Sequence, residues 1–161
     1  MAQIKQILIV CGEASGDLQA GELAKAIKKI DSRIKISGIG GESLKKSADE
    51  IYCDIKQLSV FGFFDALRKL PKFIALKELI LKKINETSAQ GIILVDFSGF
   101  NLRLAKAINK KIPVIYYVSP QVWASRPGRI QTIKEYISKM VVLFKFEEDF
   151  YRRHNIKVDF V

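Results

Sequence analysis

The chain has 161 residues, of which 48% are apolar and 27% are charged. A chain of this length and composition can bury a real core, which excludes a disordered linker, a collagen-like repeat and a disulfide-stapled miniprotein. Its 27 Lys and Arg outnumber its 17 Asp and Glu to give a net charge of +10. A positive electrostatic field of this kind attracts nucleic acid, an anionic membrane or a phosphorylated substrate. The alternative is that the excess only reflects lysines scattered on solvated helix faces.

The cysteines and the N-terminal region indicate the compartment. Cys11 and Cys53 form no C-x-x-C pair, so a reducing cytoplasm is favoured over a disulfide. The apolar run from Ile7 to Cys11 is too short for a signal peptide, and no window reaches the roughly 18 apolar residues of a spanning helix. His154 stands alone, so neither a metal site nor a cofactor is expected.

Short apolar runs alternate with helical patterns along the chain, and this predicts a doubly wound, mostly parallel α/β sheet with about five or six strands. The first strand does not alternate, which indicates burial on both faces. Strands are expected at 7–11, 34–37, around 51–52, 92–95, 114–118, 141–144 and 158–161. Helices are expected at 18–30, after 41, from Pro71 onward, and at 101–110, 128–137 and 147–154. Pro71 is expected to start or restart a helix, because proline is tolerated in a first helical turn.

In a doubly wound sheet, ligands bind beyond the carboxyl ends of the strands. The loops that follow strands are therefore the candidate sites: 12–17, 38–41, 96–101 and 119–129.

The first of these loops reads Gly-Glu-Ala-Ser-Gly-Asp over residues 12–17. Its two glycines allow a close approach of backbone to a ligand, and a helix N-terminus suits a phosphate or a sugar hydroxyl. The spacing fits neither a P-loop nor the dinucleotide fingerprint. The alternative is a tight turn in which Ser15 or Asp17 caps the helix.

The loop after the strand 92–95 carries a single carboxylate, Asp96. Apolar neighbours such as Phe97 and Phe100 disfavour its ionised form, which suits a general base. The alternative is an aspartate that caps the helix expected from Asn101.

The loop 119–129 holds the only Trp of the chain, Trp123, together with Arg126 and Arg129. An exposed Trp can stack on a sugar, and Arg can bind phosphate with two hydrogen bonds. The alternative is a Trp packed on the sheet edge beside solvated arginines.

The segment from Leu58 to Lys83 mixes aromatic and aliphatic residues with basic ones, a composition that suits a helix lying in a membrane interface. The alternative is an amphipathic helix pair whose apolar side joins the core. The aromatics lack the strand alternation of a base-stacking platform, so nucleic acid is not expected as a partner. The candidate membrane-docking residues are Val60, Phe61, Phe63, Phe64, Leu67, Arg68, Lys69, Lys72 and Phe73.

Together these loops resemble the lipid-A-disaccharide synthases, glycosyltransferases of Gram-negative lipid A biosynthesis. Residues 12–17 are similar to the first signature of that family, and Val118-Ser119-Pro120-Gln121-Val122-Trp123-Ala124 is similar to the second. The segment 96–101 occupies the place of the family's Asp-x-Pro-Asp-Phe-Asn motif, with Ser98 and Gly99 in place of Pro-Asp. Ser125 stands where the second signature usually has another Trp.

The resemblance implies a metal-independent, inverting transferase. It would move 2,3-diacylglucosamine from UDP onto 2,3-diacylglucosamine 1-phosphate, giving the β(1→6)-linked disaccharide 1-phosphate and UDP. Asp96 would be the general base. Substrate would be bound by Gly12, Glu13, Ala14, Ser15, Gly16, Asp17, Asn101, Ser119, Pro120, Gln121, Trp123 and Arg126.

Members of this family are longer, and their UDP-binding half follows the stretch that resembles this chain. We therefore expect residues 1–161 to be the N-terminal, acceptor-side, Rossmann-like domain of a two-domain GT-B-type enzyme, without the C-terminal UDP-binding domain and inactive alone. The resemblance also implies a cytoplasmic protein, peripheral on the anionic inner membrane. Two other interpretations remain: a nucleotide-sugar-binding or epimerase-like module, and a basic surface-binding domain without chemistry.

Overall fold

The computed structural model describes residues 5–59, 66–120, 122 and 128–161, with only the backbone at 59 and 66–70. The described chain forms one parallel sheet of seven strands in the order β3-β2-β1-β4-β5-β6-β7. The strands are β1 (Gln6–Val10), β2 (Lys35–Gly40), β3 (Glu50–Asp54), β4 (Gly91–Val95), β5 (Val114–Tyr117), β6 (Lys139–Val142) and β7 (Val158–Phe160). The predicted α/β class is confirmed, and the sheet has seven strands rather than five or six because the short segments 50–54 and 158–160 both pair as edge strands.

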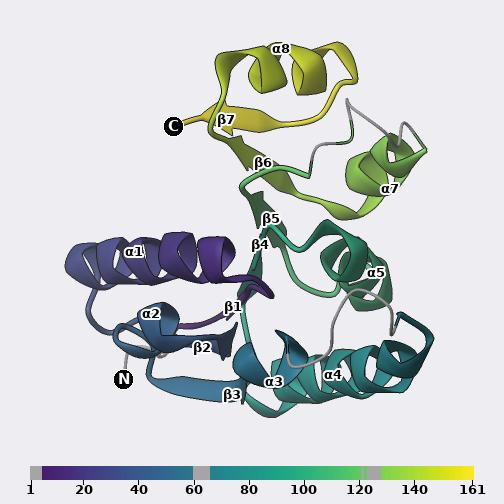
Figure 1. Ribbon diagram of the computed structural model, residues 1–161. Helices are drawn as coiled ribbons and strands as arrows, with labels where there is room; N and C mark the ends of the chain where they lie inside the picture. The colour runs from purple at the N-terminus through teal and green to yellow at the C-terminus, as the bar shows by residue number, and fades with distance from the viewer. Residues whose placement is uncertain (1–4, 60–65, 121, 123–127) are drawn as a thin grey trace.

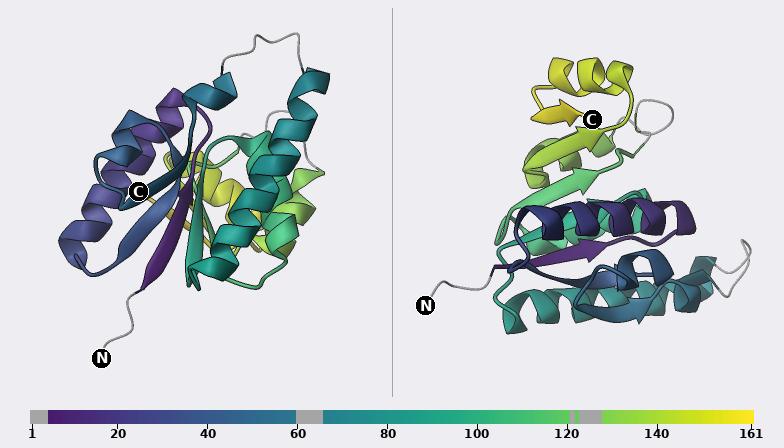
Figure 2. Two further views of the ribbon diagram at one scale, coloured as in Figure 1. Left: turned by 90° about the horizontal axis from the view of Figure 1, so that it is seen from below. Right: turned by 90° about the vertical axis from the view of Figure 1, so that its left-hand side faces the viewer.

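The helices that connect the strands lie on both faces of the sheet. Helices α1 and α2 cover one face, and α4, α5 and α7 cover the other (Figures 1 and 2). The helices are α1 (Ala14–Ile30), α2 (Glu42–Lys45), α3 (Lys56–Ser59), α4 (Ala66–Glu86), α5 (Ser98–Ile108), α7 (Arg129–Tyr136) and α8 (Lys145–Arg153). In the parts of the chain that the structure describes, no helix is both long and apolar enough to cross a bilayer.

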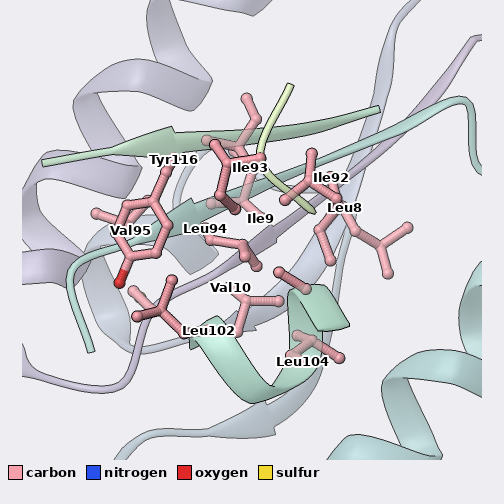
Figure 3. Packing of buried hydrophobic residues seen from close by; sticks show 14 of the residues in the cluster. Leu8, Ile9, Val10, Ile92, Ile93, Leu94, Val95, Leu102, Leu104 and Tyr116 are labelled. Carbon is pink, nitrogen blue, oxygen red and sulfur yellow. The ribbon is translucent and has the colours of Figure 1, made fainter. Parts of the chain in front are cut away.

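The core lies around the central strands β1 and β4, as the non-alternating apolar runs predict. Leu8, Ile9, Val10 and Leu94 are fully buried, and Figure 3 shows them packed among the side chains of β4, β5 and α5. Each such aliphatic side chain stabilises the fold by about 1.5–3 kcal/mol relative to an exposed one.

The position of Pro71 differs from the prediction. It lies inside α4, which begins at Ala66, rather than in a first turn. Proline removes one backbone donor, but the helix continues to Glu86. It is stabilised there because the buried side chains of Leu76, Ile80 and Ile84 pack against the core.

The strand order reverses between β1 and β4, which are neighbours in the sheet although β2 and β3 separate them in sequence. The chain leaves β1 toward α1 on one face and leaves β4 toward α5 on the other (Figure 1). This is the topological switch point at which open α/β sheets bind ligands, and the loops 12–17 and 96–101 both begin there.

Candidate active site

Asp96 lies in a sharp turn between β4 and α5. Asp96 has φ 49° and Phe97 has φ 47°, so two successive non-glycine residues adopt the left-handed conformation. Such backbone is strained by about 1–3 kcal/mol per residue and persists only where the surroundings hold it. Asp96 is half-buried, so its side chain retains access to solvent.

Three hydrogen bonds hold the backbone of Asp96. The Tyr116 hydroxyl donates to the Asp96 carbonyl oxygen at 2.5 Å, and Asn101 Nδ2 donates to the same oxygen at 2.8 Å. The Asp96 N–H donates to the carbonyl oxygen of Tyr117 at 3.2 Å. The strained turn is therefore tied to both β5 and α5.

Asn101, a candidate substrate-binding residue, lies beneath the turn and bonds to its backbone. Its side chain is fully buried, and its Nδ2 also donates to the carbonyl oxygen of Val95 at 3.3 Å. Its Oδ1 has no hydrogen-bond partner among the described residues. Asn101 thus supports the turn that carries Asp96 from within the protein.

The loop after β1 contacts this turn directly. A Cβ added at Gly16 would lie 3.6 Å from the Cβ of Asp96 and 3.5 Å from that of Cys11. A Cβ added at Gly12 would lie 2.3 Å from the Phe97 ring. The two glycines therefore let the first signature loop lie against the aspartate turn, and this explains their spacing.

Residues 13–15 form the accessible part of the first signature. Glu13, Ala14 and Ser15 are exposed at the N-terminus of α1, where no side chain caps the helix. The first i to i−4 hydrogen bond of the helix runs from the Asp17 N–H to the Glu13 carbonyl oxygen at 2.9 Å. The earlier N–H groups of the helix and its dipole favour an anion or an acceptor oxygen at this point, beside Asp96.

Asp17 has a structural role, contrary to both expectations for it. Its carboxylate is buried and accepts the N–H groups of Gly41 at 2.6 Å, Ser43 at 2.9 Å and Leu44 at 3.1 Å. It therefore caps α2 rather than α1 and joins α1 to the end of β2. A carboxylate used in this way is not available to a substrate.

The glycines near residues 38–41 likewise serve packing. Gly38 lies within β2, where an added Cβ would be 1.8 Å from the Ile9 carbonyl oxygen. At Gly41 an added Cβ would lie 2.9 Å from the Asp17 carboxylate. This candidate loop is filled by the protein itself.

The second signature is anchored to α8. The buried Ser119 hydroxyl donates to Glu147 Oε1 at 2.6 Å, and the Tyr151 hydroxyl donates to the Pro120 carbonyl at 3.1 Å. Ser119 and Pro120, both candidate substrate-binding residues, are buried in this arrangement. Gln121, Trp123 and Arg126 lie outside the described residues.

Arg129 links the two helices that begin at this edge of the sheet. Its Nη1 donates to the Ser98 hydroxyl at 2.9 Å, joining the start of α7 to the start of α5. Ser98 replaces a proline of the family motif, and here its hydroxyl makes this helix-to-helix bond.

A cluster of three aromatic rings borders the site. The centroids of Phe73, Phe97 and Phe100 lie 5.4–5.8 Å apart. Phe73, a candidate membrane-docking residue, is half-buried, and its ring packs against the core and lies beside Phe97. Lys72, another candidate docking residue, is exposed.

The rest of the proposed membrane segment is not placed. Residues 60–65, which include Val60, Phe61, Phe63 and Phe64, and the side chains of Leu67, Arg68 and Lys69 lie outside the described residues. Among the residues that are described, no three His, Cys, Asp or Glu side chains gather in a possible metal site.

Sequence reasoning missed Tyr116. A tyrosine in a buried strand needs a hydrogen-bond partner for its hydroxyl, and that requirement is the only signal in the sequence. Nothing in the pattern indicates that the partner is the carbonyl of Asp96, 20 residues earlier.

The fold and this site define a Rossmann-like α/β domain with its candidate site at the topological switch point. The model of the lipid-A-disaccharide synthetase family matches residues 7–161, so the chain belongs to that family.

Curated relatives agree with this assignment. The lipid-A-disaccharide synthase of Coxiella burnetii is 37% identical over 158 residues, covering 98% of this chain and 42% of the relative. That of Koribacter versatilis is 38% identical, covering 96% of this chain and 41% of the relative. Lipid-A-disaccharide synthase 1 of Legionella pneumophila is 39% identical, covering 100% and 42%. The chain thus spans about 42% of the length of the relatives it matches.

Proposed function

We propose that this chain is the acceptor-side domain of a glycosyltransferase that makes the lipid A disaccharide. The reaction transfers 2,3-diacylglucosamine from UDP to 2,3-diacylglucosamine 1-phosphate and yields the β(1→6)-linked disaccharide 1-phosphate and UDP. Two observations carry the proposal: the match to the family, and the single carboxylate Asp96 beside the α1 N-terminus at the switch point.

In the proposed mechanism Asp96 is the general base. Its carboxylate accepts the proton of the acceptor's 6-hydroxyl while that oxygen attacks the anomeric carbon of the donor. The new O6–C1 bond forms as the bond from C1 to the UDP oxygen breaks, and the electron pair leaves with UDP. Attack from the opposite face inverts the anomeric centre and gives the β linkage, and no metal ion is needed for the step.

The surroundings of Asp96 fit an acylated sugar phosphate. The exposed start of α1, at residues 13–15, offers N–H groups for sugar oxygens or phosphate. The half-buried rings of Phe97 and Phe73 give the other side of the turn an apolar wall. Trp123 and Arg126 are proposed to complete the acceptor side. The net charge of +10 favours approach to phosphorylated substrates.

We propose that the segment from Val60 to Lys72 docks on the anionic inner membrane from the cytoplasm, where acylated substrates reside. Exposed Lys72 and the 50% exposed Ile74 at this end of α4 support the proposal. Sedimentation with anionic vesicles tests it. The Phe63→Ser and Phe64→Ser variants should lose most of the binding, and Phe144→Ser, which alters an exposed Phe of another element, should not.

Ligand binding to the 161-residue chain tests the acceptor-side assignment. Diacylglucosamine 1-phosphate with shortened acyl chains should bind and shift the amide resonances of residues 12–16, 96 and 97. UDP should not bind, and the chain alone should not turn over the two acylated sugars. Micromolar UDP binding without acceptor binding would instead favour a nucleotide-sugar-binding module.

Replacing the segment of the Coxiella burnetii relative that matches this chain over 158 residues by the corresponding residues of this chain tests the role of Asp96. Asp96→Asn should lower kcat at least about 100-fold, the usual contribution of a general base. The control Asp54→Asn changes a carboxylate at the end of β3 and should leave kcat unchanged. Full activity of Asp96→Asn would favour a surface-binding domain without chemistry.

A further inference from the structure

We propose that Tyr116 is a positioning residue for Asp96: its buried hydroxyl holds the left-handed turn that carries the candidate base. The inference rests on the proposed function of Asp96 for its catalytic meaning. The positioning itself is a property of the fold, and the test below measures it without turnover.

The turn needs a holding contact because its backbone is strained. Asp96 and Phe97 both adopt positive φ, a conformation that bulky L-residues rarely take. The Phe97 ring lies against Gly12. The Phe97 carbonyl accepts hydrogen bonds from two N–H groups in the first turn of α5, those of Phe100 at 3.1 Å and Asn101 at 3.0 Å. Relaxation of the turn would therefore move the Asp96 side chain and the start of α5 together.

The Tyr116 hydroxyl acts directly on this turn. It comes from β5, the strand paired with β4, and donates to the Asp96 carbonyl oxygen at 2.5 Å. The side chains of Tyr116 and Asn101 are fully buried, so bulk water does not compete for the shared oxygen. Figure 3 shows the Tyr116 ring within the buried cluster around β4.

The protonation state of Tyr116 suits a permanent donor. Burial, followed by the charge of Asp96, raises the pKa of its hydroxyl far above the ordinary range. The phenol therefore keeps its proton at neutral pH. The hydroxyl is therefore a donor to the Asp96 carbonyl oxygen, as the 2.5 Å contact indicates.

Other buried or half-buried tyrosines hold different places and provide a comparison. The Tyr52 hydroxyl donates to the Ser37 hydroxyl at 2.7 Å. These residues lie in β3 and β2, which β1 and β4 separate from β5 in the sheet. Tyr52→Phe removes one phenol hydrogen bond at a distance from Asp96. It is therefore the matched control for Tyr116→Phe, in which phenylalanine keeps the ring and its packing.

The experiment compares the parent chain, Tyr116→Phe and Tyr52→Phe by NMR. We expect the Cα and Cβ resonances of Asp96 and Phe97 to move away from left-handed values only in Tyr116→Phe. Amide hydrogen exchange at Asp96, Phe100 and Asn101 should accelerate roughly fivefold relative to core amides of β1, the effect of one net hydrogen bond.

Equal changes in the two variants, or equal acceleration at the turn and in β1, would overturn the proposal. Such a result would show that the Tyr116 hydroxyl only adds to global stability. These signals do not depend on substrate. A failure of acceptor binding to the parent chain would therefore remove the proposed function and leave the positioning result to be decided separately.

Discussion

The Phe97 ring lies against the backbone of Gly12, so that a Cβ added at Gly12 would be 2.3–2.6 Å from three ring carbons. This contact closes the base of the site, because it joins the loop after β1 to the turn after β4. Real Cβ atoms do not approach other atoms so closely, so position 12 requires glycine in this fold.

Gly12→Ala is therefore expected to displace the Phe97 ring and the strained turn beneath it. We expect a loss of about 1–3 kcal/mol in the free energy of unfolding, measured by urea denaturation. Gly99→Ala is the control, because nothing lies within 4 Å of its added Cβ. Gly99 is the second residue of α5, where alanine should be neutral or stabilise the protein by up to about 1 kcal/mol. Equal effects of the two substitutions would contradict the packing seen at Gly12.

Asp17→Asn should destabilise the end of the sheet next to α2. The amide keeps one acceptor oxygen but loses the charge that satisfies three backbone N–H groups, those of Gly41, Ser43 and Leu44. We expect a loss of about 3 kcal/mol by chemical denaturation, with faster amide exchange at these three residues.

The comparison for Asp17 is Asp54→Asn. Asp54 accepts one exposed N–H, that of Lys56, at 2.8 Å. Its replacement should cost less than about 1 kcal/mol. An Asp17→Asn variant as stable as Asp54→Asn would show that the three bonds add nothing.

Glu148 should contribute to the pH dependence of stability. A hydrogen bond from Lys145, together with Arg152 at 2.5 Å, holds the pKa of Glu148 below its ordinary value of 4.5. The unfolded state therefore binds the proton first as the pH falls. The contribution is present above the unfolded pKa and is lost as the pH falls through the folded one.

Melting temperatures measured from about pH 6 to about pH 3 check this sign. The difference between the parent and Glu148→Gln should shrink as the pH falls. Glu22→Gln is the control, because its ion pair with Lys25 spans 3.8 Å between exposed side chains and should contribute little at any pH. A Glu148→Gln difference that stayed constant with pH would refute the coupling.

The two thiols should react at very different rates. Burial, followed by the charge of Asp17, raises the pKa of Cys11 to about 12, and Cys11 is fully buried. Cys53 is half-buried, and burial raises its pKa as well. At about pH 8 a thiol reagent should therefore modify Cys53 slowly and Cys11 only after unfolding.

Peptide mass spectrometry of the labelled protein, with and without urea, measures this order. The Cys53→Ser variant should take up almost no label while folded. Labelling of Cys11 in the folded protein would show that the end of β1 opens far more often than its packing implies.

Much of the fold could be predicted because its signal is local. Apolar runs such as 7–11 and 92–95 do not alternate, which identifies strands buried on both faces. Pro71 was misplaced because helix position depends on the buried face of α4, which reaches the core only in the folded chain. Both edge strands were located in the sequence, but the total was set at five or six because short segments pair only when a neighbour is present.

The candidate site was predicted only in part. Asp96 and the loop 12–17 were found because strand ends of a parallel sheet share an edge, and the structure does bring them into contact. Asp17, Asn101 and Ser119 were assigned to substrate, but each is buried and bonded within the protein. The residue type of a polar position in a motif does not tell whether its side chain binds a ligand or the protein's own backbone.

The amino-acid sequence by itself determined the parallel α/β class, the family and the edge of the sheet at which the loops gather. Periodicity and motif spacing carry that information, because both are short-range along the chain. Only the tertiary structure decided that Tyr116 and Asn101 support Asp96 and that Phe97 lies on Gly12. Those partners come from different elements and meet only when β1, β4 and β5 pair, so no local pattern specifies them.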